Sequence, residues 1–137
     1  MGLHVKLVLD TCAMRNKDLL DWIARRTSGD VCIPAVVYME LCRQALAKKN
    51  SIDGLRILID KCNIKVLQFD KHHAELVAEY MNRDIVVCPT CNKLNWNDTM
   101  IYASVGNPPT IFITDNVKDF PSIYPEYIKT PREIMAM

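Results

Sequence analysis

The stretch Leu7-Val8-Leu9-Asp10-Thr11 joins an apolar run to an acidic and a hydroxyl residue near the start of the chain. The run itself, from His4 to Leu9, is short and continuous, which is typical of a buried strand. The segment Thr110 to Thr114 is rich in β-branched residues and is followed directly by Asp115. Both segments therefore predict strands that end at a carboxylate.

Strand and helix patterns alternate along the rest of the chain. Pro34 suits the first turn of a helix, and Ser51, Asp70 and Asn97 are good helix caps. Further strands are expected at 31–33 and 64–67, with a weak one near 127–129. Helices are expected at 16–26, from 34 to about 48, after Ser51 through 59, after Asp70 through 81, and from 98 to about 104.

This alternation predicts a parallel sheet covered by helices on both faces. The chain has 137 residues, enough for one domain and too few for a second of ordinary size. We find no internal repeat, low-complexity segment or linker. The expected fold is a single three-layer α/β/α domain over residues 1–137, with a mostly parallel sheet of four or five strands.

The charge balance argues against a protein that coats nucleic acid unselectively, because 17 Lys and Arg face 16 Asp and Glu. The start lacks the pattern of a signal peptide. The longest apolar stretch, Val31 to Met39, is too short to span a bilayer. We expect a soluble, cytoplasmic protein without disulfides, in which Cys12, Cys32, Cys42 and Cys62 act as small buried hydrophobes.

Several acidic residues are expected at one edge of the sheet, since ligands of such folds bind beyond the carboxyl ends of the strands. Asp10 and Asp115 follow strands, and Asp119 lies four residues after Asp115. Glu40 lies on the polar flank of its helix, and Asp98 opens another helix, where the helix dipole favours a carboxylate. All five are candidate catalytic residues.

Clustered carboxylates repel one another unless a cation lies between them. Two unit charges about 4 Å apart cost on the order of 4 kcal/mol at an effective dielectric near 20. Mg²⁺ or Mn²⁺ suits a site built from carboxylate oxygens and water. Such an ion activates water against a phosphodiester. The chain has no P-loop, no G-x-G-x-x-G and no G-x-S-x-G.

Four stretches resemble, in order and spacing, the four motifs of PIN-domain nucleases, and the chain is most similar to VapC-like toxins of toxin–antitoxin pairs. They are Leu7-Val8-Leu9-Asp10-Thr11, Tyr38-Met39-Glu40-Leu41, Trp96-Asn97-Asp98-Thr99-Met100-Ile101 and Ile113-Thr114-Asp115-Asn116-Val117-Lys118-Asp119-Phe120. The resemblance implies a metal-dependent endoribonuclease that leaves a 5′-phosphate, forms a homodimer and is inhibited by a small antitoxin.

The family's invariant acids fall on Asp10, Glu40 and Asp98. Where many members carry a fourth acid, this chain has Asn116, with Asp115 and Asp119 on either side. One of these two is expected to hold the metal or its water. The expected metal ligands are thus drawn from Asp10, Asp98, Asp115 and Asp119.

The remaining features have alternative interpretations. Thr11 and Thr114 either orient the neighbouring carboxylates or simply end their strands. Arg43 is a candidate contact for RNA phosphates, and Trp96 either stacks on a base or, as we rather expect, packs against the protein. Cys88 and Cys91 have the spacing of half a zinc site or a redox pair, but no second pair exists, and an incidental loop is the favoured interpretation.

Three rival functions remain. A phosphatase or phosphoacceptor domain also places Asp after its first strand, but the haloacid-dehalogenase type needs a second Asp where this chain has Cys12. A DNA nuclease related to flap endonucleases is usually longer. The strongest alternative is a non-catalytic PIN-like module that binds RNA within a processing assembly.

Overall fold

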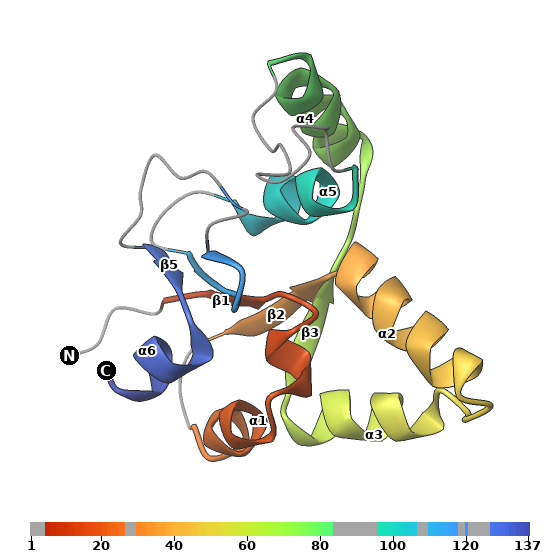
Figure 1. Cartoon of the computed structure of the whole chain (residues 1–137), viewed down its shortest axis with the longest axis vertical. Helices are drawn as coiled ribbons and strands as arrows, with labels where there is room; N and C mark the ends of the chain where they lie inside the picture. The colour runs from red at the N-terminus through yellow and green to blue at the C-terminus, as the bar shows by residue number, and fades with distance from the viewer. Residues whose placement is uncertain (1–4, 27–29, 84–95, 107–109, 118–119, 121–126) are drawn as a thin grey trace.

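A sheet of five strands lies at the centre of the computed structural model of the chain (Figure 1). The structure describes residues 5–26, 30–83, 96–106, 110–117, 120 and 127–137. The strands are β1 (Leu7–Leu9), β2 (Val31–Pro34), β3 (Ile64–Leu67), β4 (Ile111–Ile113) and β5 (Ile128–Lys129). Their order is β3-β2-β1-β4-β5 and each neighbouring pair is parallel, which confirms the predicted sheet, including its weak last strand.

Helices cover both faces of this sheet and complete the predicted three-layer α/β/α arrangement. Figure 1 shows α4 and α5 on one side of the sheet and α1, α3 and α6 on the other, while α2 runs outward from the end of β2. The helices are α1 (Lys17–Ala24), α2 (Ala35–Ala47), α3 (Asp53–Lys61), α4 (Lys71–Asn82), α5 (Trp96–Val105) and α6 (Pro131–Met135), with a short 3-10 helix, η1 (Ala13–Arg15).

Polar side chains define where several helices begin. The Asn16 side chain accepts a hydrogen bond from the Leu19 backbone at the start of α1. Asp70 accepts one from the His73 backbone and caps α4, as the sequence predicts. Thr130 caps α6 in the same way through the Glu133 backbone. These bonds satisfy amide groups that a helix leaves unpaired in its first turn.

Three predicted helix starts differ from the structure. Pro34 is the last residue of β2 and the N-cap of α2, because its extended ψ of 150° belongs to the strand. Ser51 precedes the N-cap of α3 by one residue, although its hydroxyl still accepts a bond from the Asp53 backbone. Asn97 does not cap α5, since that helix already begins at Trp96. Helix α6 was not predicted.

The core is densest around the two central strands. β1 and β4 are buried along their whole length, and Leu7, Leu9 and Ile113 are at most 1% exposed. Each such side chain stabilises the fold by about 1.5–3 kcal/mol relative to an exposed one. β3 lies at the sheet edge, and its Lys65 and Val66 face solvent. The central strands are therefore the rigid part of the scaffold.

The strand order creates a switch point between β1 and β4. β1 pairs with β2 on one side and with β4 on the other, so the connections leave β1 in opposite directions. Beyond the carboxyl ends of two such strands a crevice forms that the connections do not fill. Asp10 and Thr114 follow these two strands, so the fold brings both residues to this edge of the sheet.

The described cysteines Cys12, Cys32, Cys42 and Cys62 are free thiols. Cys32 and Cys62 are buried, as expected of small hydrophobes, whereas Cys12 and Cys42 are only half-buried. Cys88 and Cys91 lie outside the described residues. Within the described ranges, no helix combines the length and apolar character that crossing a membrane requires.

Candidate active site

The carboxyl ends of β1 and β4 lie side by side and carry complementary polar groups. Leu9 is paired with Ile113 in the parallel register, and the Asp10 backbone amide donates to the Ile113 carbonyl at 2.9 Å. The next side chains therefore meet, and Thr114 Oγ1 donates to Asp10 Oδ2 at 2.7 Å. Thr114 is fully buried and Asp10 is 5% exposed. The first predicted site residue is thus held at the switch point of the sheet.

Both oxygens of the Asp10 carboxylate accept hydrogen bonds. The Thr11 backbone amide donates to Oδ1 at 2.8 Å, while Thr114 donates to Oδ2. The Cys12 thiol donates a weaker bond to Oδ2 at 3.7 Å. A carboxylate that is fixed on both sides loses little further freedom when it binds a ligand, so Asp10 is preorganised.

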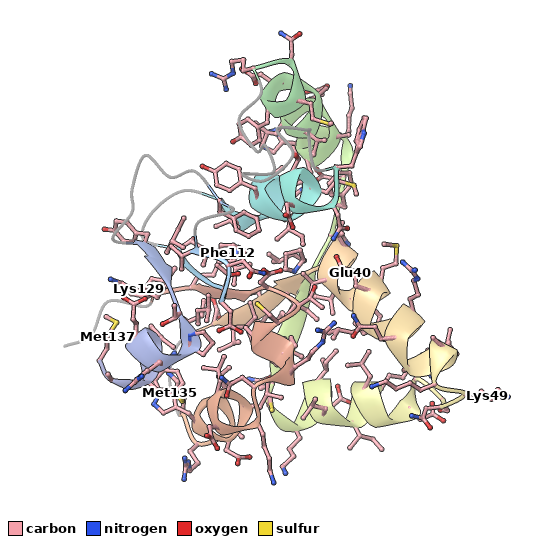
Figure 2. The ribbon with its side chains drawn as sticks, viewed as in Figure 1. Glu40, Lys49, Phe112, Lys129, Met135 and Met137 are labelled. Atoms are coloured by element: carbon pink, nitrogen blue, oxygen red, sulfur yellow. The ribbon has the colours of Figure 1, made fainter. Side chains whose placement is uncertain are left out.

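Glu40 reaches the same edge of the sheet from α2. The helix starts directly after β2, which pairs with β1, and Figure 2 shows Glu40 on the part of α2 nearest the sheet. Thr11 Oγ1 donates to Glu40 Oε2 at 2.7 Å. The amide of Asn97, in the first turn of α5, donates to the other oxygen, Oε1. Thr11 therefore links Asp10 and Glu40, through its backbone amide to one and its hydroxyl to the other.

Burial and hydrogen bonding act on the pKa of Asp10 in opposite directions. Loss of hydration raises its pKa above the ordinary value, the bonds from Thr114, Thr11 and Cys12 lower it, and the negative charge of Glu40 raises it again. The net direction is upward. A buried carboxylate with a second acid beside it is costly to ionise. A cation at this place would remove that cost.

Cys12 contacts residues at both strand ends. Its Sγ accepts a hydrogen bond from the Asp115 backbone amide at 3.2 Å and lies 3.6 Å from Thr114 Oγ1. Burial raises the pKa of this thiol, so it keeps its proton and can donate to Asp10. The expectation of a purely hydrophobic cysteine is wrong for Cys12, because its contacts are polar.

The other predicted site residues differ in their placement. Asp98 is half-buried in the first turn of α5, next to Asn97, and Asp115 is exposed. Asp119 lies outside the described residues. Arg43 is exposed on α2 three residues after Glu40, and therefore on the same face of that helix. Figure 2 shows Lys49 at the far end of α2, away from Glu40.

The oxygen donors at this edge suit a hard divalent cation such as Mg²⁺ or Mn²⁺, which prefers carboxylates. Asp10 and Glu40 supply such donors and carry the negative charge that an ion would offset. Among the described residues, however, no three His, Cys, Asp or Glu side chains are grouped closely enough to hold a metal. The structure therefore contains a carboxylate pair within its described part, and the larger acidic cluster stays a prediction.

The contacts and the exposure of individual side chains decide several of the interpretations that the sequence left open. Thr11 and Thr114 orient the neighbouring carboxylates, which decides between the two interpretations of these residues. Trp96 is 65% exposed, so the expectation that it packs against the protein is wrong. Asn97 and Cys12 were missed as site residues. In the sequence, a role for Asn97 in the site could have been inferred from its position next to the candidate Asp98. A role for Cys12 could have been inferred from its position two residues after Asp10.

The sequence of the chain matches one known protein family. A sequence model of the PIN domain matches residues 8–116 of the chain. That range includes Asp10, Glu40, Asp98 and Asp115. No curated protein matches the chain in sequence.

Three solved structures resemble the fold. A chain of VapBC-1 from nontypeable Haemophilus influenzae has 18% identity and a TM-score of 0.62, covering 84% of this chain and 90% of its own. A chain of a toxin–antitoxin complex from Klebsiella pneumoniae has 18% identity and a TM-score of 0.66, and the match covers 91% of this chain and 97% of that one. A chain of VapBC2 from Rickettsia felis, bound to a DNA fragment from its promoter, has 16% identity and a TM-score of 0.58, and the match covers 92% of this chain and 98% of that one. At these identities the likeness establishes a common fold.

Proposed function

This chain belongs to the PIN-domain family, and we propose that it is an endoribonuclease dependent on Mg²⁺ or Mn²⁺, acting as the toxin of a toxin–antitoxin pair. The observation that carries the proposal is the pairing of buried Asp10 with Glu40 through Thr11 at the switch point of the sheet. PIN domains are known as nucleases, and closely spaced acidic groups such as this pair support metal-dependent cleavage of a phosphodiester.

Asp10 and Asp98 hold the metal in this proposal, together with Asp115 or Asp119. When bound, a divalent ion supplies an activated water and offsets negative charge on the phosphodiester under attack. Asp10 is supported as a ligand by its burial and by the bonds that fix both of its oxygens. Asp98 is supported by its place in α5 beside Asn97, which contacts Glu40.

The protein's own groups orient the reactants. Thr114 and the Thr11 amide hold Asp10 in one rotamer, which fixes the direction in which its remaining lone pairs point. Glu40 lies beside it and accepts the proton of the attacking water at one of its two carboxylate oxygens. Holding such groups in place before the substrate arrives lowers the entropy that the reaction must lose.

RNA binding is assigned to residues at the rim of the site. Arg43 lies one helical turn beyond Glu40 and is exposed, so its guanidinium can contact a phosphate. Trp96 is exposed next to Asn97 and offers a ring for stacking on an unpaired base. Both features favour single-stranded RNA, whose bases are accessible.

A small antitoxin protein is the proposed partner, and the proposed active form is a homodimer in the cytoplasm. The structures that resemble this fold are toxin–antitoxin complexes, which supports the partner. Co-expression with the product of a short neighbouring gene, followed by size-exclusion chromatography, tests both the partner and the oligomeric state.

The decisive experiment is cleavage of end-labelled single-stranded RNA with Mg²⁺, Mn²⁺ or EDTA. Wild type should cut only with metal, and Asp10→Asn and Asp98→Asn should not cut. Asp60→Asn is the matched control, because Asp60 is an exposed acid on α3. Activity that survives Asp98→Asn in a rigorously purified sample would contradict the proposal. A 5′-phosphate on the product, detected by phosphatase sensitivity, is expected as well.

A non-catalytic module that binds RNA is the second candidate. It is favoured by the exposed Trp96 and Arg43 near the site, which would serve RNA binding equally well in a protein that does not cleave RNA. Such a module would bind RNA without cleaving it, and its affinity would be independent of Mg²⁺ or Mn²⁺. Titration of the protein with Mn²⁺, combined with RNA binding measured by fluorescence anisotropy, separates the two functions.

A further inference from the structure

Glu40 is held from two sides by residues of different elements. Thr11, directly after β1, donates its hydroxyl to Oε2, and Asn97 of α5 donates its amide to Oε1. Glu40 and Asn97 are 57 positions apart, and both are half-buried. The Asn97 bond therefore joins α2 to α5 at the edge of the site.

The chemistry of the donor at position 97 matters as much as its place. An uncharged amide restrains a carboxylate and leaves its negative charge in place, whereas Lys or Arg would neutralise that charge. A long side chain on a helix otherwise samples several rotamers, and each restraint on it lowers that freedom. Two donors from opposite sides leave Glu40 one orientation, beside Asp10.

We propose that Asn97 is a positioning residue, which holds the Glu40 carboxylate in its working orientation and sets the first turn of α5 against α2. Asp98 lies in the same turn, so one bond at Asn97 determines the placement of acids from both helices. The inference rests on the proposed function of Glu40. Asn97 is assigned no contact with RNA or metal and acts on the reaction only through the Glu40 carboxylate.

The first test measures the contact itself, independently of activity. The side-chain amide signals of Asn97 in ¹⁵N–¹H NMR spectra should differ from those of exposed Asn82, and their exchange with solvent should be slower. Glu40→Ala should move the Asn97 signals toward those of Asn82, whereas Glu79→Ala on α4 should leave them unchanged. Asn97 signals that do not respond to Glu40→Ala would overturn the proposal.

The second test is a double-mutant cycle read out by thermal unfolding. Asn97→Ala should lower the midpoint in wild type, and the same change should have almost no effect when Glu40 is already Ala. Equal losses in both backgrounds would show that Asn97 supports the fold independently of Glu40, and would overturn the proposal. Spectral dispersion verifies that each variant is folded.

The third test connects the contact to the reaction. Asn97→Asp keeps the side-chain shape but replaces the donor with a second negative charge, so kcat should fall by about 10- to 100-fold, as for other groups that orient a metal-site residue. The KM for RNA should stay within about threefold, and Asn97→Gln, which keeps the amide, should recover part of the loss. Asn82→Asp on α4 adds the same charge and should change nothing. A rise in KM with kcat unchanged, or no change in either constant, would contradict the assigned role.

The failure of the proposed function has a different signature from the failure of this inference. Wild type that cleaves no RNA with any metal would reject the nuclease, and the NMR arm would still decide whether Asn97 restrains Glu40. Wild type that cleaves, with Asn97→Asp fully active, would reject only the positioning role.

Discussion

The carboxyl ends of β1 and β4 carry the same two residue types in opposite order. Leu9-Asp10-Thr11 follows one strand, and Ile113-Thr114-Asp115 follows the other, with Leu9 and Ile113 level in the register. The acid therefore comes first after β1 and is buried, whereas the hydroxyl comes first after β4 and the acid is exposed. A change of order by one residue decides which carboxylate is enclosed by the protein.

This difference has a clear electrostatic reason. Two carboxylates at the same level of adjacent strands would repel each other in a buried place. With Thr114 opposite Asp10, the second strand instead contributes a donor to the first strand's acceptor. The β1 end is thus a preorganised site, and the β4 end supplies its support and places Asp115 at the rim.

Asp10→Asn should reduce RNA cleavage more than any other substitution at the two strand ends. Of Asp10 and Asp115, only Asp10 is buried and has both carboxylate oxygens hydrogen-bonded. Residues that merely support a metal site contribute about 10- to 100-fold, so loss of a ligand as buried and preorganised as Asp10 should reduce cleavage by at least about 100-fold. Initial rates on end-labelled RNA measure it. A comparable loss in Asp115→Asn, with Asp10→Asn active, would reverse the comparison.

The same substitution should stabilise the metal-free protein. The folded state raises the pKa of Asp10 above its reference value of 3.8, so the stability that depends on this group is full below that value and falls as the pH rises through the folded-state pKa. At pH 7 wild type bears the cost of the buried charge and Asn does not. The thermal midpoint in EDTA should rise by about 2–6 °C, and the gain should shrink toward about pH 4.

A lower midpoint for Asp10→Asn at neutral pH would show that the hydrogen bonds to the carboxylate outweigh its burial. Thermal scans of both proteins at the two pH values, with and without Mn²⁺, separate these cases. Mn²⁺ should raise the midpoint of wild type only, since a ligand that binds the folded state stabilises it.

Thr114→Val tests the support that β4 gives to β1. Valine matches threonine in shape but removes the donor to Asp10 Oδ2 and the acceptor of the Asn116 amide. We expect cleavage to fall by about 10- to 100-fold, as for other groups that orient a metal ligand. Thr114→Ser keeps the hydroxyl and should retain most activity. Equal rates for Val and Ser would show that the hydroxyl has no role in the reaction.

The sequence predicted those parts of the molecule that depend on local patterns. The strands at β1, β2, β3 and β4 follow from apolar runs, and the cap at Asp70 follows from the residue type preferred there. The parallel sheet follows from the alternation of strands and helices. The acids after β1 and β4 were placed at one edge by the general geometry of such sheets.

The contacts between distant segments were not predictable in this way. Asn97 has the residue type of a helix cap, but α5 starts one residue earlier and its amide instead donates to Glu40. Cys12 reads as a small hydrophobe in sequence, yet the register of β1 and β4 places its thiol against the Asp115 amide. Both roles depend on tertiary packing, which single-residue preferences do not encode.

Asp115→Asn compared with Asp119→Asn identifies the fourth acid. Asp115 is exposed and its backbone is fixed by Cys12, so it can act only from the rim of the site. An exposed ligand should matter less than the buried Asp10, so Asp115→Asn should cost about tenfold if Asp115 is the ligand, and Asp119→Asn should be the variant that loses activity if it is not. The Kd for Mn²⁺ should weaken only in the variant that loses activity. If neither affects cleavage or metal binding, the fourth position is not acidic in this protein.

Cys12→Ser should have the smallest effect, and it tests whether the thiol at the β1 end acts through its hydrogen bonds. A serine hydroxyl can still donate to Asp10 and accept from the Asp115 amide, so cleavage should stay within about threefold of wild type, near the value of one ordinary hydrogen bond. Cys12→Ala removes both contacts and should lose more activity than Cys12→Ser. If Ala and Ser were equally active, the two strand ends would be coupled through Thr114 and not through Cys12. Cleavage rates of wild type and both variants should be compared under reducing conditions, because oxidation of the Cys12 thiol in wild type would also alter its contacts with Asp10 and the Asp115 amide.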